Sequence, residues 1–143
     1  MKGNRVKVCL ARFARRAADH EQERTDQKVN LAERFALLDG PYEPGIVGYV
    51  NDYKLQVVEV LGPFVWHRHE ETDDFLLVLS GRLTIHLGDR DIELGDGELY
   101  VVPRGVEHCP EATEEALVLL IEPDGTPHTG DAGGPMIAAP RSL

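Results

Sequence analysis

Residues 62–81 read GPFVWHRHEETDDFLLVLSG. One residue separates His67 from His69, so in an extended strand both imidazoles point to the same face and Arg68 points away. Two neighbouring imidazoles are what a Zn, Fe, Mn, Ni or Cu ion needs. Asp74 opens the next apolar run, so it is the acid best placed to turn inward. The acids of this loop are Glu70, Glu71, Asp73 and Asp74.

A third imidazole comes from a separate stretch, residues 97–112, which reads GELYVVPRGVEHCPEA. His108 follows the tight turn at Pro103–Val106. Together with His67, His69 and Asp74 it would give three nitrogens and one oxygen, a set that leaves positions open for water or substrate. A lone His-x-His also arises by chance on exposed strands, so the spacing alone leaves a metal site and solvated histidines both open.

Short apolar or alternating runs divided by turn residues predict an all-β fold, a sandwich or a closed barrel. One short helix is expected first, because Asn30 and Glu33 have N-cap spacing and Gly40-Pro41 would end the helix. The expected strands are Ile46–Val50, Lys54–Leu61, Phe64–His69, Asp74–Leu79, Arg82–Leu87, Arg90–Leu94, Glu98–Val102 and Ala116–Glu122.

Length and charge limit the function. The chain has 143 residues, two cysteines and a formal charge of −10, which predicts one globular domain without a disulfide framework. Residues 1–28 carry a formal +4 and residues 29–143 a formal −14. The acidic body should repel nucleic acid and anionic lipid. We predict a flexible basic extension (1–28), a β-barrel domain (29–123) and a mostly disordered Gly/Pro-rich tail (124–143).

The spacing of both stretches resembles that of the cupin superfamily. The first cupin motif matches Gly62, His67, His69, Asp74 and Gly81, with Asp in place of the usual Glu. The second matches Gly97, Pro103, Gly105 and His108, with Ala112 in place of the usual Asn, which is not a ligand. The resemblance extends over residues 51–122 and is closest to small single-domain cupins often labelled mannose-6-phosphate-isomerase-like, whose start resembles Val29–Glu33.

This resemblance implies a small jelly-roll β-barrel, the double-stranded β-helix. It also implies a divalent metal ion (Zn, Fe, Mn or Ni) on His67, His69, His108 and Asp74. The chain would then bind or act on a small polar metabolite, a sugar or carboxylate, as an isomerase or dioxygenase. The alternatives are a non-catalytic sensing module and a metal-free structural barrel. A homodimer through the edge strand Ile46–Val50 and a cytoplasmic location complete the expectations.

Several other cysteine, histidine and aromatic residues are expected to be structural or solvent-exposed. Strand alternation sends Cys109 to the face opposite His108, as a buried thiol and not a ligand. His86 is expected either to line the barrel or to face solvent or a dimer contact, with the latter favoured, and Phe64 and Trp66 to pack in the core. His128 is expected to be solvated. The sequence contains no Gly-x-Ser-x-Gly, Walker or His-Glu-x-x-His motif.

Overall fold

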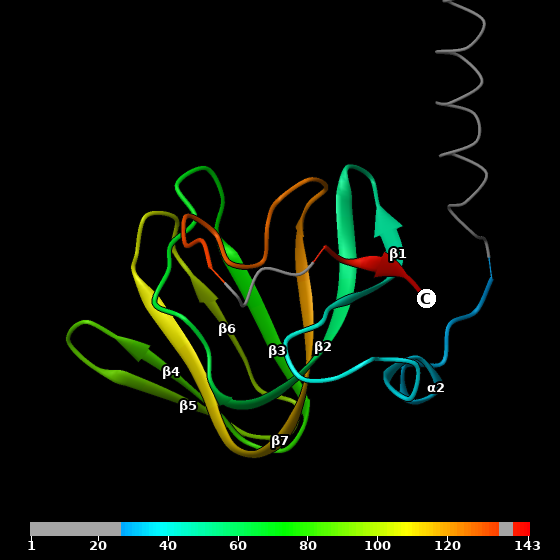
Figure 1. Ribbon diagram of the computed structural model, residues 1–143, viewed down its shortest axis with the longest axis horizontal. Coiled ribbons are helices and arrows are strands. Elements are labelled where there is room, and N and C mark those ends of the chain that lie inside the picture. The colour runs from blue at the N-terminus through cyan, green and yellow to red at the C-terminus, as the bar shows by residue number, and fades with distance from the viewer. Residues whose placement is uncertain (1–26, 135–138) are drawn as a thin grey trace, which may run out of the picture.

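The computed structural model describes residues 27–134 and 139–143, which form one β-structure with a short helix (Figure 1). Most of the predicted basic extension, including Cys9 and His20, lies outside the described residues. The elements are α2 (Leu31–Phe35), β1 (Gly45–Val50), β2 (Tyr53–Pro63), β3 (Asp74–Ser80), β4 (Leu83–Leu87), β5 (Asp91–Leu94), β6 (Leu99–Val102), β7 (His108–Pro123) and β8 (Arg141–Ser142).

The long strand β7 organises the sheet. One edge of β7 pairs antiparallel with β2 along most of its length. The other edge is shared, because the first residues of β7 pair with β4 and the later ones with β3. β5 then adds to β4, β6 to β3 and β1 to β2, which curls the sheet into the predicted jelly-roll barrel (Figure 1).

The core lies on the inward face of these strands. β3 and β4 alternate between buried and half-buried residues, as expected for strands with one face against a core. Val78, Ile85, Ala116 and Val118 are completely buried. The same alternation of inward and outward residues continues beyond the apolar core. At one end of β2, β3 and β7 the inward residues are polar, and the candidate site lies there.

Gly81 shows why the motif needs glycine between β3 and β4. Its φ is +99°, a conformation that side chains rarely adopt. A Cβ there would lie 2.7 Å from the carbonyl oxygen of Glu115 and 2.9 Å from Cα of Ala116. The turn therefore packs directly against the backbone of β7, and only glycine fits.

The helix α2 begins as predicted and is shorter than the sequence suggests. The side chain of Asn30 accepts a hydrogen bond from the backbone N–H of Glu33 at 3.3 Å, which is the expected N-cap contact. The α-helix ends at Phe35, before the Gly40-Pro41 stop. At the other end of the chain, β8 pairs with Gly45 and Ile46, so the predicted edge strand β1 is covered there.

The predicted strand Phe64–His69 is wrong. This segment makes only an isolated bridge, between His67 and His108, and Trp66 is 49% exposed instead of buried in the core. The predicted start of the last strand at Ala116 is also wrong, because β7 begins at His108. Residues 113–115 of β7 are polar and exposed at the bend between the two halves of the strand. They interrupt the apolar pattern, so the sequence did not reveal that the strand is continuous.

Within residues 27–134 and 139–143, no helix has the length and apolar character needed to cross a membrane.

Candidate metal centre

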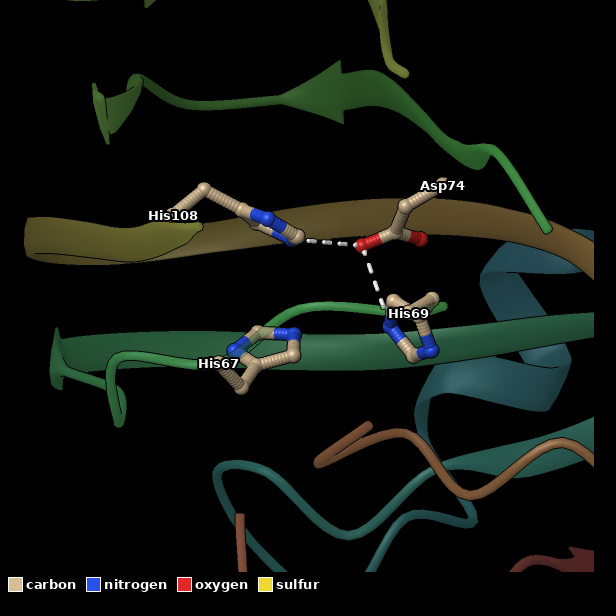
Figure 2. Close-up of side chains that lie close together, drawn as sticks. All are labelled: His67, His69, Asp74 and His108. Carbon is tan, nitrogen blue, oxygen red and sulfur yellow. Dashed lines mark hydrogen bonds and ion pairs between the residues drawn. The ribbon is translucent and has the colours of Figure 1, made fainter. Parts of the chain in front are cut away.

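Four side chains converge at the polar end of the barrel: His67, His69, Asp74 and His108 (Figure 2). The first two come from the segment between β2 and β3, while Asp74 opens β3 and His108 opens β7. All four are buried, and one potential ligand atom from each lies within 4.8 Å of the others. The structure thus brings together the residues that the two sequence stretches singled out.

Backbone contacts hold the His-x-His segment in place without a regular strand. The amide of His67 donates to the carbonyl of His108 at 3.0 Å, and the amide of His108 donates back at 2.9 Å. The carbonyl of His69 accepts from the amide of Gly105, in the tight turn, at 2.8 Å. Both imidazoles are consequently buried while Arg68 between them is exposed, as the predicted alternation required.

Two of the rings are oriented by a hydrogen bond from Nδ1 to a backbone carbonyl. Nδ1 of His67 lies 2.9 Å from the carbonyl oxygen of Val65, and Nδ1 of His108 lies 2.9 Å from that of Val106. A carbonyl oxygen only accepts, so each Nδ1 carries the hydrogen and donates it. Each Nε2 is left to face the cluster. Metal-binding histidines are oriented in this way by a hydrogen bond from their other ring nitrogen.

Asp74 reaches the imidazoles despite being one methylene shorter than the usual Glu. Its Oδ2 lies 2.9 Å from Nε2 of His108 and 3.5 Å from Nε2 of His69 (Figure 2). Burial raises the pKa of this carboxyl, but the hydrogen bond with His108 and the nearby imidazole of His69 outweigh burial and hold the pKa well below its usual range. The carboxylate is therefore ionised and directed at the nitrogens.

The two histidines of the first stretch differ in charge preference. Burial lowers the pKa of His67 to about 4, so this ring is neutral near pH 7. Burial also acts against protonation of His69, but its ion-pair contact with Asp74 and the other nearby carboxylates raise its pKa. Three buried imidazoles, two of them oriented by backbone carbonyls, and one carboxylate fit a divalent transition metal ion.

The cluster lies between an outer pocket and an inner cavity. The outer pocket, about 630 Å³, is open to solvent and is lined by His69, by the loop 70–72 and by residues 123–127, 130 and 131. The inner cavity, about 40 Å³, is largely apolar and is lined by His67 and Asp74, by Glu122 and by core residues such as Leu76. A small ligand reaching the cluster from outside would thus have apolar walls beyond it.

The C-terminal segment, residues 126–131, covers part of the site. The amide of Asp131 donates to the carbonyl of Arg68 at 3.0 Å, and its carboxylate accepts from the amide of Arg68 at 2.9 Å. His128, expected to be solvated, is buried instead and stacks on Phe64 with ring centroids 5.4 Å apart. The predicted boundary of the tail at residue 124 stays a prediction, but these contacts are more extensive than its Gly/Pro-rich composition suggests.

The sequence reasoning missed a buried polar row beside the cluster, which consists of Lys54, Gln56 and Glu122. None of the three is among the predicted site residues. Ala116, Val118, Leu120 and Glu122 alternate along β7, and the first three are inward core residues. The same alternation places Glu122 on the inward face, so the burial of this carboxylate could have been predicted from the sequence.

Two residues outside the cluster lie as expected. Cys109 is buried, with its thiol 3.6 Å from the carbonyl oxygen of Phe64, and it is not among the clustered ligand atoms. His86 is half-buried on the outer surface, between the carboxylates of Asp91 and Glu111, each 2.8 Å from one ring nitrogen.

Comparisons with known proteins agree with this geometry. The family described as Cupin domain matches residues 54–122. A cupin-2 domain containing protein from Shewanella frigidimarina NCIMB 400 is 42% identical, with 66% of this chain and 93% of that chain covered and a TM-score of 0.65. Protein NMB1881 from Neisseria meningitidis is 26% identical, with 68% and 100% covered and a TM-score of 0.63. The uncharacterized protein YdbB of Bacillus subtilis (strain 168) is 26% identical over 77 residues, 53% of this chain and 68% of its own.

Proposed function

Because the chain belongs to the cupin family, we propose that its barrel holds a divalent metal ion on His67, His69, Asp74 and His108 and binds a small polar metabolite there. The observation that carries the proposal is the buried cluster itself. In this cluster the Nδ1–H groups of His67 and His108 donate to backbone carbonyls, and the Nε2 atoms of these rings face the cluster. Buried ionisable groups of this kind are paired or bind metals.

A sugar or a carboxylate is the favoured ligand class. Three neutral imidazoles and one carboxylate leave a divalent ion with a net charge of +1, which attracts oxygen ligands. When bound, such an ion polarises a ligand oxygen as a Lewis acid. The chain's own part would be to orient the ion through the backbone-anchored rings, while the outer pocket of about 630 Å³ offers the space for the ligand. Isomerase or dioxygenase chemistry is proposed on this basis.

Metal analysis of untagged protein tests the proposal. We expect close to one equivalent of a divalent metal and a rise in melting temperature when metal is added back to the chelator-treated protein. His67→Ala and His108→Ala should abolish both effects. His86→Gln is the matched control, because this histidine lies outside the cluster. Less than a tenth of an equivalent in the unsubstituted protein, before and after metal addition, would contradict the proposal.

A homodimer is also proposed, and the structure favours the sheet face over the predicted edge of β1. On the outer face, Leu99 pairs with Leu77, which pairs with Leu119. In the next row Val101 pairs with Phe75, which pairs with Ile121. Leu99 is 52% and Val101 41% exposed. These two apolar rows, bordered by the charged residues Asp73 and Arg104, suit burial against a second copy.

A further inference from the structure

Three polar side chains are buried in the barrel wall next to the metal cluster. Lys54 and Gln56 lie on β2 and Glu122 lies on β7, and they are 2%, 0% and 2% exposed. Lys54 pairs with Glu122 in the sheet register, and Gln56 pairs with Leu120 one row deeper. All three therefore belong to the inward face of the barrel, where polar groups are costly unless they have partners.

Gln56 and Lys54 both contact the same oxygen of Glu122. Nε2 of Gln56 donates to Oε1 of Glu122 at 2.6 Å, and Nζ of Lys54 lies 3.5 Å from this oxygen. Nζ of Lys54 also donates to the carbonyl of Thr126 at 2.8 Å, which fixes the ammonium. These contacts hold the carboxylate through Oε1 and leave Oε2 outside both of them.

Gln56 presents a second acceptor. Its Oε1 is buried and has no hydrogen-bond partner in the part of the chain that the structure describes. A buried acceptor without a partner costs about 1–3 kcal/mol, so native proteins rarely keep one. This amide oxygen therefore lacks a donor among the described protein atoms, and it lies next to the carboxylate of Glu122.

The polar row adjoins the metal cluster. Phe75 of β3 pairs with Ile121 of β7, so Asp74 and Glu122, the next residues outward on their strands, are neighbours on the inward face. Side chains so placed have Cβ atoms about 5 Å apart. Asp74 and Glu122 also line the same inner cavity of about 40 Å³, together with His67. Their proximity is reflected in the pKa of Glu122, which burial and then the charge of Asp74 raise.

We infer that Glu122 and Gln56, held by Lys54, accept hydrogen bonds from a hydroxyl group of the ligand, and that this ligand is a hydroxy acid whose carboxylate binds the metal ion. The inference rests on the proposed function and specifies its substrate class. Lys54 already neutralises Glu122, so the row calls for a neutral donor. An ammonium group would also be repelled by a metal site with a net charge of +1. A hydroxyl group satisfies both conditions, and the carboxylate of the same molecule suits the ion.

The test compares lactate and 3-hydroxypropionate with propionate by calorimetric titration of the Zn²⁺-loaded full-length protein. We expect the hydroxy acids to bind at least tenfold more tightly, because an analogue without the hydroxyl leaves buried acceptors unpaired. A hydroxyl can also chelate the ion directly. The decisive quantity is therefore the hydroxy-to-deoxy affinity ratio in variants of the polar row.

Glu122→Gln should reduce that ratio at least tenfold with the bound metal unchanged. The double variant Lys54→Met with Glu122→Leu removes both buried charges together and should do the same if the single variant folds poorly. Glu111→Gln, a carboxylate on the outer face of β7, is the control and should keep the ratio. An unchanged ratio in metal-loaded variants, or no binding of any of the three acids, would overturn the inference and leave the metal site standing. Failure of the unsubstituted protein to take up metal would overturn both.

Discussion

Oδ2 of Asp74 lies 2.9 Å from Nε2 of His108, and this contact joins the first residue of β3 to the first residue of β7. Nδ1 of the same imidazole donates to the carbonyl of Val106, so the ring is anchored on both sides. A proton or a metal ion between Nε2 and Oδ2 offsets the burial of the carboxylate. The pair therefore contributes to stability and to the ligand set at the same time.

Replacing Asp74 tests this double role in the metal-free protein. Asp74→Ala leaves two buried imidazoles without their carboxylate and should lower the free energy of unfolding by about 3 kcal/mol in chelator-treated protein. Urea denaturation followed by circular dichroism measures the loss. Asp89→Ala removes a largely exposed carboxylate, paired only with Arg90 at the surface, and should change the free energy by less than about 0.5 kcal/mol. Equal effects of the two substitutions would contradict the role of Asp74.

His86, outside the cluster, predicts a pH-dependent contribution to stability. Hydrogen bonds to Asp91 and Glu111 raise the pKa of His86, so its imidazolium is favoured in the folded state. A raised pKa stabilises the fold at pH values below the unfolded pKa of 6.5, and this stabilisation is lost as the pH rises through the folded pKa.

We therefore expect His86→Gln to lower the melting temperature more at pH 6 than at pH 9. The imidazolium faces only these two carboxylates across β5 and β7, and both must stay ionised, so measurements should remain above pH 5. Scanning calorimetry of both proteins across this range gives the comparison. A melting-temperature difference that grows with pH would refute the assignment.

Gly130 predicts how tightly the C-terminal segment is held. Its φ is +55°, and a Cβ there would overlap the carbonyl oxygen of Arg68. Gly130→Ala should weaken the docking of residues 126–131 by about 1–2 kcal/mol. Faster hydrogen exchange of the Asp131 amide, which donates to Arg68, would report it. Gly133→Ala, where a Cβ meets nothing within 4 Å, is the matched control. Unaltered exchange in the Gly130 variant would argue against a docked segment in solution.

The proposed dimer face makes a simple prediction. Val101→Lys places a charge on the exposed outer face of β6 and should convert the dimer to a monomer in light scattering at micromolar concentration. Leu37→Lys substitutes another exposed apolar residue, just after α2, and should leave the dimer intact. A monomer mass for the unsubstituted protein would reject the dimer altogether.

Much of the barrel could be predicted because alternation and turn residues are local signals. The runs that became β3 and β4 show the alternation, and Gly81 marks the turn between them. The segment Phe64–His69 was wrongly predicted to be a strand because its side chains alternate as they would in a strand. Of these residues only His67 forms a β-bridge, to His108. Pairing depends on the path of β7, which no local pattern reveals.

The candidate cluster could likewise be named from spacing, because turns of fixed length return each motif to the same end of the barrel. What could not be predicted depends on contacts between distant segments. Gln56 and Glu122 are 66 residues apart and meet only through the register of β2 with β7. His128 is buried because Gly130 allows its segment to dock on Arg68.

The anchoring of His67 and His108 through the carbonyls of Val65 and Val106 has a consequence for protein engineering. Main-chain carbonyls persist whatever side chain occupies those positions, so the aim of these two rings is a property of the chain path. Substitutions at Asp74 would then change the ligand set of the proposed metal site while the orientation of these two rings is kept.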